Sequence, residues 1–327
     1  RLTLGSTLRP VAQRSALLRY ALTEGREGSP GGRFMLYRDE GYAFFRDTWT
    51  PDGGYGAAFH AVFTAAAHAG LGHKQWDDLS FVLYAFGAPL LVDAGAYSYD
   101  AADPARRYVV SAKAHNTVIV DDVGFEGWTA RIEAGVDGEG FAAVRGSHAN
   151  DPGWRHRRTL VHLRPYRLVV VDDVVPTGTR AGVVEHTFDQ LFHLAPHLDA
   201  AADPAQPGVV VARDATGAAK LRIRQLVEPE RPVTVVRGAT QPLQGWVTKA
   251  HGELEPASVV ATQARGRRAR FVTVITALSD TSADSSPDPV IAVAEGDEVA
   301  LAETTAPGRE LRIGVGDALA VELRPRR

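Results

Sequence analysis

Strand-like runs follow one another along most of this sequence without helical segments between them. Beyond residue 33, short stretches rich in Val, Phe, Tyr, Leu and Thr alternate with clusters of Gly, Pro and Asp, which is typical of β-strands and the turns that join them. The clearest runs are residues 41–49, 58–66, 81–87, 159–174, 185–196, 208–213, 220–227, 270–278 and 310–316. Strands that follow strands without intervening helices pair in antiparallel fashion. The sequence therefore predicts a mainly β fold, a large antiparallel β-sandwich.

One stretch near the beginning differs from the rest. Residues 9–24 have a helix-forming composition with apolar residues at helical spacing, so we expect one amphipathic helix there. The SPGGR segment at residues 29–33 ends this helix, because Gly and Pro break helical structure. A subdomain boundary near residues 241–255 is a second expectation for the organisation of the chain.

The composition describes an ordinary globular protein. Of the 327 residues, 45% are hydrophobic and 23% are charged, which is unlike a disordered or membrane-embedded chain. No segment approaches the ~20 consecutive apolar residues that a membrane-spanning helix needs, and the net charge of -3 disfavours a general nucleic-acid binder. We therefore expect neither a membrane span nor a nucleic-acid partner. The absence of cysteine excludes disulfides and thiolate chemistry but leaves the compartment open.

The densest group of candidate functional residues lies between residues 72 and 122. If the chain is extended here, the two-residue side-chain period places His73, Gln75 and Asp77 on one face. Two strand-like runs follow, and the second of them ends at Asp93. A third run begins directly after His115. Three neighbouring strands are therefore expected to bring His73, Asp93 and His115 to one polar spot.

Several spaced motifs in this region are similar to those of a known family. They are GHKQWDDLSFVLYAFGAPLLVDAGAYSY at residues 72–99, RRY at residues 106–108 and AHNTVIVDD at residues 114–122, with GYAFFRDTW before them and HRRTLVHLRPYRLVVVDDV and QLFHLAP after them. Together they resemble the C-terminal β-sandwich of the heparinase II/III-like polysaccharide lyases. The resemblance covers residues 37–196.

This resemblance implies a particular domain organisation. Family members place a helical α/α toroid before the sandwich, with the active cleft between the two. Residues 1–32 would then be the end of the toroid domain, and residues 33–327 would be the heparinase II/III-like sandwich domain. The partners implied are the N-terminal helical toroid and an acidic polysaccharide, and the location implied is periplasmic or secreted. The chain would be part of a longer enzyme and incomplete by itself.

The activity that the resemblance implies is β-elimination on a polysaccharide that contains uronic acid. The proton beside the sugar carboxylate is weakly acidic, so an enzyme must neutralise the carboxylate, supply a base and protonate the departing oxygen. Histidine, with a reference pKa of ~6.5, keeps a usable neutral fraction near neutral pH. The resemblance places His73 at the catalytic histidine, as the base or as the group that neutralises the carboxylate. The family's partner tyrosine lies in the helical domain.

Other residues near this histidine are candidates for contact with the sugar. Tyr108 is the second catalytic candidate, able to hydrogen-bond the sugar or to lie near the transferred proton. Arg107 offers a bidentate pair to a uronate, which lysine could not reproduce. Tyr97 and Tyr99 are expected to share one face of a strand and stack on a sugar ring, and Asp77 to bind substrate or fix the histidine tautomer. The alternative for the tyrosines is an ordinary sandwich rim.

Some family members bind a structural zinc through positions that can be carried onto this chain. These positions are Gln75, Asp93 and His115, and Gln75 departs from the pattern, which has a histidine there. An amide oxygen is a poor zinc ligand, and two good ligands fall short of the three or four of a protein zinc site. A structural zinc and a hydrogen-bonded cluster in which Asp93 orients His115 both stay open. No other cofactor is expected.

Two functions of different classes remain. In the first, the chain supplies the sandwich wall of a lyase active site. In the second, it is a noncatalytic β-sandwich that binds acidic glycans or supports a neighbouring domain. A binding wall has no need of a histidine at position 73, whereas elimination does. Alginate, heparin-like chains and bacterial exopolysaccharides all present a uronate, so the glycan is left open.

Overall fold

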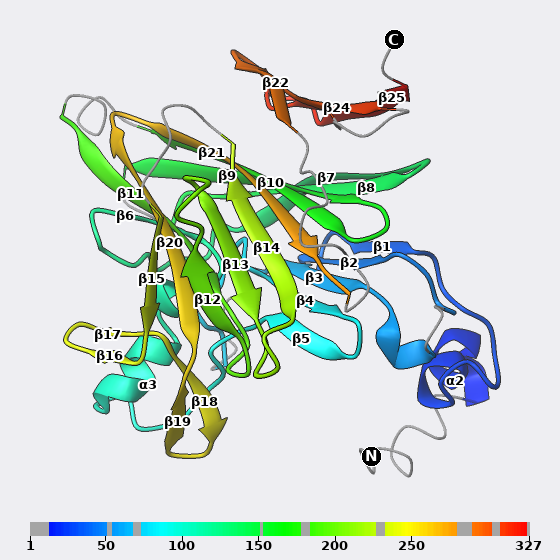
Figure 1. Cartoon of the computed structure of the whole chain (residues 1–327), viewed down its shortest axis with the longest axis horizontal. Coiled ribbons are helices and arrows are strands. Elements are labelled where there is room, and N and C mark those ends of the chain that lie inside the picture. Colours follow the sequence, from blue (N-terminus) through cyan, green and yellow to red (C-terminus); the bar gives the residue numbers. More distant parts are fainter. Residues whose placement is uncertain are drawn as a thin grey trace.

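Antiparallel strands make up most of the structure. The computed structural model describes residues 13–50, 54–67, 73–150, 153–177, 184–226, 233–279, 290–302 and 308–325. In this part of the chain the strands form sheets of eight, five, four, four, two and two strands (Figure 1), and their pairings are antiparallel. The predicted mainly β, antiparallel fold is confirmed.

The central strands of the eight-stranded sheet are buried on both faces. In β10 (Arg167–Pro176), Leu168 and Val170 belong to one apolar cluster, whereas Val169 and Val171 belong to another. Successive strand residues point to opposite faces, so the unbroken apolar run of this strand reflects cover on both sides. In sheet order, the strands are β12 (Asp199–Ala202), β13 (Val209–Arg213), β14 (Ala219–Gln225), β21 (Ala269–Ala277), β10, β9 (Trp154–Leu163), β8 (Phe141–His148) and β7 (Arg131–Gly138).

Two smaller sheets cover one face of the large sheet. Phe63 and Leu83 of the first and Phe192 of the second share a buried cluster with Leu160 and Val170, and each such side chain contributes roughly 1.5–3 kcal/mol by leaving water. The five-stranded sheet consists of β1 (Phe34–Tyr37), β2 (Tyr42–Arg46), β3 (His60–Thr64), β4 (Phe81–Ala85) and β5 (Ala88–Leu91). The four-stranded sheet has the order β15 (Val233–Arg237), β20 (Ser258–Gly266), β11 (His186–His193) and β6 (Val118–Val120).

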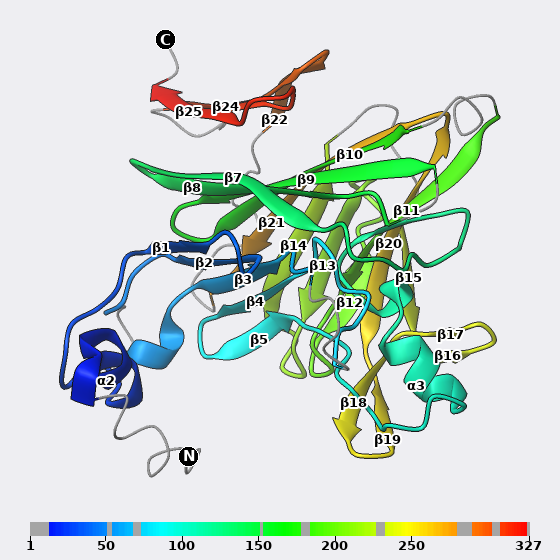
Figure 2. The ribbon, with the colours of Figure 1, turned by 180° about the vertical axis from the view of Figure 1, so that it is seen from behind.

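The last sheet covers the opposite face. Figures 1 and 2 show its orange and red strands on the far side of the large sheet from β1–β5. Val299 and Leu311 pack there against Val161 and Val169. Buried Arg145 joins the two layers by donating to the carbonyl oxygen of Gly316 at 2.9 Å. The strands are β22 (Val290–Glu295), β23 (Glu298–Ala302), β24 (Arg309–Gly314) and β25 (Ala320–Pro325).

The N-terminal helix is shorter than expected within the described residues. Helix α2 spans Ala16–Leu22, and Ser15 caps it by accepting a hydrogen bond from the backbone N–H of Leu18 at 3.1 Å. Such a cap satisfies one of the unpaired N–H groups of the first turn. Its buried Tyr20 lies edge-on to Trp49, with ring centroids 5.7 Å apart. Residues 9–12 of the predicted helix lie outside the described residues. No described helix is long and apolar enough to cross a membrane.

The stretch around residues 241–255 is an excursion from a sheet. The chain leaves after β15 and returns in β20, and these two strands pair with each other. The excursion consists of the ribbons β16 (Ala239–Thr240) with β17 (Leu243–Gln244) and β18 (Trp246–Ala250) with β19 (Glu253–Pro256). It packs beside α3 (Pro104–Val109), because Val247 shares a buried cluster with Tyr108 and Val109 (Figure 1). A subdomain boundary near residues 241–255 stays a prediction.

Candidate active site

His73 is an exposed side chain in a turn. Its ring lies edge-on to the ring of Tyr99, with centroids 5.9 Å apart. The guanidinium carbon of Arg106 lies 6.0 Å from the centroid of the same Tyr99 ring, within the range of a cation–π contact. We call His73, Tyr99 and Arg106 the His73 cluster. It brings an imidazole, a phenol and a guanidinium together at the surface.

Helix α3 explains why Arg106, and not Arg107, joins this cluster. Asp103 caps the helix by accepting from the N–H of Ala105 at 2.7 Å, and Pro104 fills its first turn, a position where a missing N–H costs nothing. Arg106 then donates to the carbonyl oxygen of Ala96 at 2.6 Å. Arg107 is exposed and donates to the carbonyl oxygen of Ala102 at 2.5 Å. Motif spacing alone did not distinguish the two arginines.

Tyr108 is buried, whereas its neighbour Arg107 is exposed. The side chain of Tyr108 is 6% exposed, and its hydroxyl oxygen accepts a hydrogen bond from the N–H of Gly245 at 3.0 Å. Burial raises the pKa of this tyrosine. The geometry therefore supports packing of α3 against residues 243–257, and it lends no support to the predicted catalytic contact.

The two tyrosines expected on one strand face are not on a strand. Residues 92–98 have no regular secondary structure, and Tyr97 has a φ of 56°, a left-handed conformation that interrupts an extended chain. Tyr97 packs against the buried cluster that contains Val247, whereas Tyr99 is 75% exposed. The prediction of a shared strand face is therefore wrong, and Tyr99 is the more exposed of the two tyrosines.

The segment of residues 73–80 is also irregular, so His73, Gln75 and Asp77 do not share an extended face. Asp77 pairs with Lys74, whose Nζ lies 2.6 Å from its Oδ1. The same Nζ lies 2.8 Å from Oδ1 of Asp78. Asp77 is thus engaged by a lysine that the sequence interpretation did not single out. Its expected partnership with the His73 tautomer has no support in this arrangement.

Asp78 ties this segment to a distant loop. Its side chain is fully buried, and its Oδ2 accepts a hydrogen bond from Nδ2 of Asn150 at 2.6 Å. Burial raises the pKa of Asp78 to about 6, although Lys74 acts in the opposite direction. Although burial would lower the pKa of Lys74, the two carboxylates beside it raise that pKa. The segment that carries His73 is therefore fixed by buried charged contacts.

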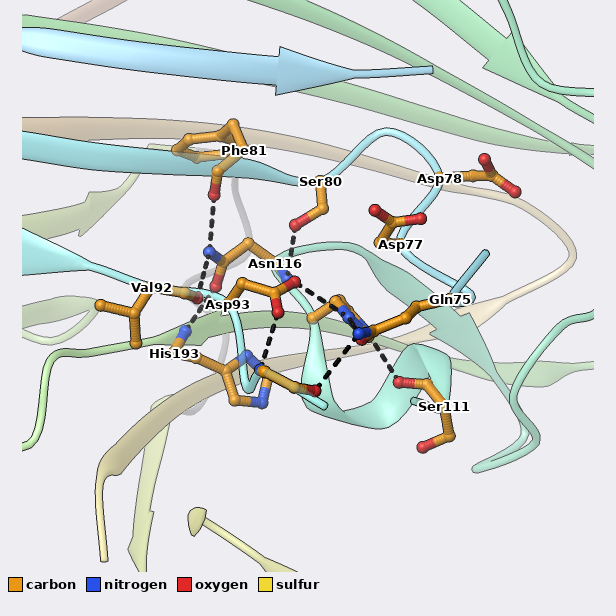
Figure 3. A network of polar contacts seen from close by, with 12 residues as sticks. Gln75, Asp77, Asp78, Ser80, Phe81, Val92, Asp93, Ser111, Asn116 and His193 are labelled. Atoms are coloured by element: carbon orange, nitrogen blue, oxygen red, sulfur yellow. Dashed lines mark hydrogen bonds and ion pairs between the residues drawn. The ribbon is translucent and has the colours of Figure 1, made fainter. Parts of the chain in front are cut away.

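Asp93 and His115 converge as the sequence predicted, and Gln75 joins them. Figure 3 shows Gln75 and Asp93 within this network of polar contacts. Nε2 of His115 lies 3.1 Å from Oδ2 of Asp93 and 3.1 Å from Oε1 of Gln75. Its Nδ1 lies 2.7 Å from the carbonyl oxygen of Ser111. Oδ1 of Asp93 also accepts from the N–H of Gly95 at 2.7 Å. His73, which was expected at the same polar spot as the Gln75–Asp93–His115 cluster, contacts Tyr99 instead.

The protonation of this cluster follows from its partners. Although burial alone would lower the pKa of His115, the charge and hydrogen bond of Asp93 raise it. Burial acts to raise the pKa of Asp93, but His115 holds that pKa below its ordinary value. Both ring nitrogens of His115 face oxygen acceptors, and only an imidazolium can donate from both. The arrangement therefore fits a charged histidine paired with a carboxylate.

The donor set decides how well a metal fits here. The ligand atoms available are one imidazole nitrogen, one carboxylate oxygen and one amide oxygen, which is a poor set for zinc. Within the described ranges, no group of three or more His, Asp or Glu side chains could hold a metal ion. The chemistry of these side chains favours the hydrogen-bonded cluster over zinc.

Asn116, the next residue along the chain, joins three structural elements (Figure 3). Its Nδ2 donates to the carbonyl oxygens of Phe81 at 2.7 Å and Val92 at 3.1 Å. Its Oδ1 accepts from the N–H of His193 at 2.6 Å. The side chain is fully buried, and its bonds satisfy backbone groups that a buried, irregular chain would otherwise leave unpaired. Asn116 thus fixes the position of its neighbour His115.

Comparison with known proteins identifies the family. The sequence profile of the family described as Heparinase II/III-like, C-terminal, matches residues 29–289. The chain belongs to this family. The resemblance found in residues 37–196 is thereby confirmed and extended towards the C-terminus. No curated protein sequence matches the chain closely enough to count as a relative.

Solved structures of heparinase-type enzymes share the fold. The crystal structure of heparan sulfate lyase HepC from Pedobacter heparinus has a TM-score of 0.76 and 17% sequence identity, with 98% of this chain and 47% of that chain covered. A crystal structure of heparinase III has a TM-score of 0.74 and 15% identity, with 98% and 48% covered. This chain spans about half the length of these structures. At sequence identities of 15–17%, this similarity shows a shared fold and nothing more.

Proposed function

We propose that this chain forms the sandwich side of the active cleft of a polysaccharide lyase that cleaves a uronic-acid-containing polysaccharide by β-elimination. The observation that carries the proposal is the exposed imidazole of His73, which lies beside Tyr99 and near Arg106. The segment that carries His73 is fixed by buried contacts of Asp78. Family membership supports the reaction class. A plain support module would have no use for this surface group.

Each chemical task has a candidate among these residues. In β-elimination a base removes the proton beside the sugar carboxylate, its electron pair forms a carbon–carbon double bond, and the glycosidic oxygen leaves and takes up a proton. His73 serves as the base or as a neutraliser of the carboxylate, and its contact with water allows exchange of the proton. Arg106 and the exposed Arg107 are the cations that can pair with the uronate, because guanidinium binds carboxylate in bidentate fashion.

A second domain is part of the proposal. The solved relatives are about twice as long as this chain, and we propose that a helical domain supplies the other wall of the cleft, with the tyrosine that completes the acid–base pair. Expressed by itself, the chain should then show little or no lyase turnover. Robust elimination by the isolated chain would contradict the need for this partner.

Replacement of His73 tests the function. In the full-length protein, His73→Ala should slow elimination by about 10²–10⁴-fold, the usual contribution of a positioned acid–base group. The measurement is the ultraviolet absorbance of new carbon–carbon double bonds formed from a panel of heparan sulfate, alginate and bacterial exopolysaccharides. His197→Ala, which removes another exposed histidine, is the control and should retain activity. Unchanged activity of the His73 variant would exclude the catalytic role, and glycan binding without double bonds would favour the noncatalytic module.

A further inference from the structure

Trp128 presents a large aromatic surface to solvent. Its side chain is 47% exposed, and it lies in the loop between β6 and β7. The residues near it in sequence, Glu126 and Thr129, are exposed and polar. Val123 of the same loop is also exposed, at 62%. A protein interface is usually marked by a larger contiguous apolar patch than two such side chains among polar ones.

The ring is held by a second tryptophan from the segment that carries His73. Trp76 lies edge-on to Trp128, with ring centroids 5.4 Å apart and an interplanar angle of 62°. Trp76 itself is fixed, since its backbone N–H donates to the carbonyl oxygen of Val110 at 3.0 Å and its side chain packs against the buried cluster that contains Phe125 and Leu191. The exposed ring therefore rests on a buttressed partner.

A hydrogen-bonded link fixes the backbone beside the ring. Oδ1 of Asn150 accepts from the N–H of Thr129 at 2.9 Å and from its hydroxyl at 2.7 Å. Nδ2 of the same Asn150 donates to buried Asp78 at 2.6 Å. The Trp128 loop is therefore connected to residues 73–80 twice, through Trp76 and through Asp78. A ring placed in this way loses little conformational entropy when it binds a ligand.

We propose that Trp128, supported by Trp76, is a stacking platform for a pyranose ring of the glycan chain whose reactive uronate lies at His73. One face of a pyranose ring consists largely of C–H groups, and an aromatic face covers it while the sugar hydroxyls stay in water. A sugar with one apolar face suits a single exposed indole flanked by polar Glu126 and Thr129 better than a protein surface does. The inference rests on the proposed function, because it names a subsite of the same cleft.

Binding measured apart from catalysis tests the platform. Heparan sulfate and alginate tetrasaccharides are titrated into full-length protein carrying His73→Ala, which keeps them uncleaved, with or without Trp128→Ala. The dissociation constant should rise about tenfold on loss of the indole, the equivalent of about 1.4 kcal/mol, and Trp128→Phe should restore part of the affinity. Tyr166→Ala is the matched control, because Tyr166 is 37% exposed and also packs on an aromatic ring, that of Phe86.

Kinetics separate this inference from the function on which it rests. With His73 intact, Trp128→Ala should raise KM and leave kcat nearly unchanged, because the ring does not touch the reacting atoms. Equal dissociation constants with and without the indole, in proteins of equal melting temperature, would overturn the platform even if elimination is observed. A loss of affinity in Trp128→Ala that disappears at a lower temperature, at which this variant is fully folded, would also overturn it. Full elimination activity of His73→Ala, together with an intact effect of Trp128 on tetrasaccharide binding, would reject the catalytic role of His73 and retain the platform.

Discussion

Nε2 of His115 lies 3.1 Å from Oδ2 of Asp93, and the imidazole is fully buried whereas the carboxylate is 39% exposed. The pair therefore joins a buried cation to an anion at the surface. The carbonyl oxygen of Ser111 on the other ring nitrogen leaves the imidazolium with acceptors on both sides. Loss of the Asp93 charge would leave Nε2 with only the neutral amide oxygen of Gln75 at 3.1 Å and would remove the counter-charge of a buried cation, which is costly.

Asp93→Asn should destabilise the protein mainly at mildly acidic pH. The raised pKa of folded His115 means that its stabilising contribution is present below the unfolded value of 6.5 and is lost as pH rises through the folded value. We expect a loss of about 1 kcal/mol in unfolding free energy near pH 6, since the exposure of Asp93 weakens the pair, and a smaller loss near pH 9. Urea titration at both pH values measures it. Asp100→Asn, at an exposed loop aspartate, is the control and should show no such pH dependence. An equal loss of unfolding free energy at both pH values in Asp93→Asn would refute the charged pair.

Gln75 should decide whether zinc binds at this cluster. Elemental analysis of the purified wild-type protein is expected to give zinc well below one equivalent, because the amide oxygen of Gln75 is a poor ligand beside Asp93 and His115. Gln75→His supplies a second imidazole and should raise zinc binding towards one equivalent. Gln75→Asn, which keeps an amide, is the control. Stoichiometric zinc in the wild-type protein would overturn the preference for hydrogen bonds.

Arg158 should be among the residues on which stability depends most. Its fully buried guanidinium pairs with Asp172 through Nε at 2.7 Å and Nη2 at 2.8 Å, and its Nη1 donates to the carbonyl oxygens of Leu79 and Asn116. Burial acts to raise the pKa of Asp172, but Arg158 and His156 hold that pKa well below its ordinary value. Arg158→Met should lower the unfolding free energy by about 3–5 kcal/mol, because it leaves a buried carboxylate without its main partner.

A double-mutant cycle isolates this pair. Asp172→Asn and Arg158→Met combined should cost roughly 0.5–3 kcal/mol less than the sum of the single changes, because the amide needs no cation. Chemical denaturation of the four proteins gives the coupling. Strict additivity would show that Arg158 acts through the backbone carbonyls alone.

His162 should make the protein sensitive to acid. Its ring stacks on Phe59 at a centroid distance of 4.4 Å, and its Nε2 donates to the carbonyl oxygen of Pro165 at 2.9 Å. Burial lowers the pKa of His162 from 6.5 to about 4, so the unfolded chain binds a proton that the folded one resists. The stability present above pH 6.5 is therefore lost as pH falls towards 4, by about 1.4 kcal/mol per pH unit for one proton.

His162→Gln should remove this dependence while keeping an N–H donor for Pro165. Between pH 4 and 6.5, the slope of unfolding free energy against pH should then be smaller than in the wild type by about 1.4 kcal/mol per pH unit, the contribution of one proton. The pKa of Asp78 is raised to about 6, so its contribution to the unfolding free energy changes with pH in the opposite direction. This contribution is the same in both proteins and cancels when their slopes are compared. His197→Gln at an exposed site is the control, and identical slopes in wild type and His162→Gln would contradict a buried neutral imidazole.

The pattern of the sequence predicted the parts of the fold that depend on local chemistry. β-branched and aromatic runs, such as the one that contains β10, became strands. The meeting of Asp93 with His115 was also foreseen, because each residue flanks a strand whose place in the motif was evident. The same approach failed in residues 73–80 and 92–98, where the chain has no period from which to infer the facing of side chains.

The sequence by itself therefore determined strand content, antiparallel pairing and the positions of the candidate motifs, since these follow from backbone preferences and side-chain periodicity within a few residues. The tertiary structure alone decided that Tyr99 and Arg106 accompany His73, that Tyr108 is buried, and that Asn150 fastens Asp78. These contacts join irregular segments whose relative placement depends on how the sheets stack. Stacking minimises exposed apolar area over the whole molecule, and no local stretch of sequence contains that information.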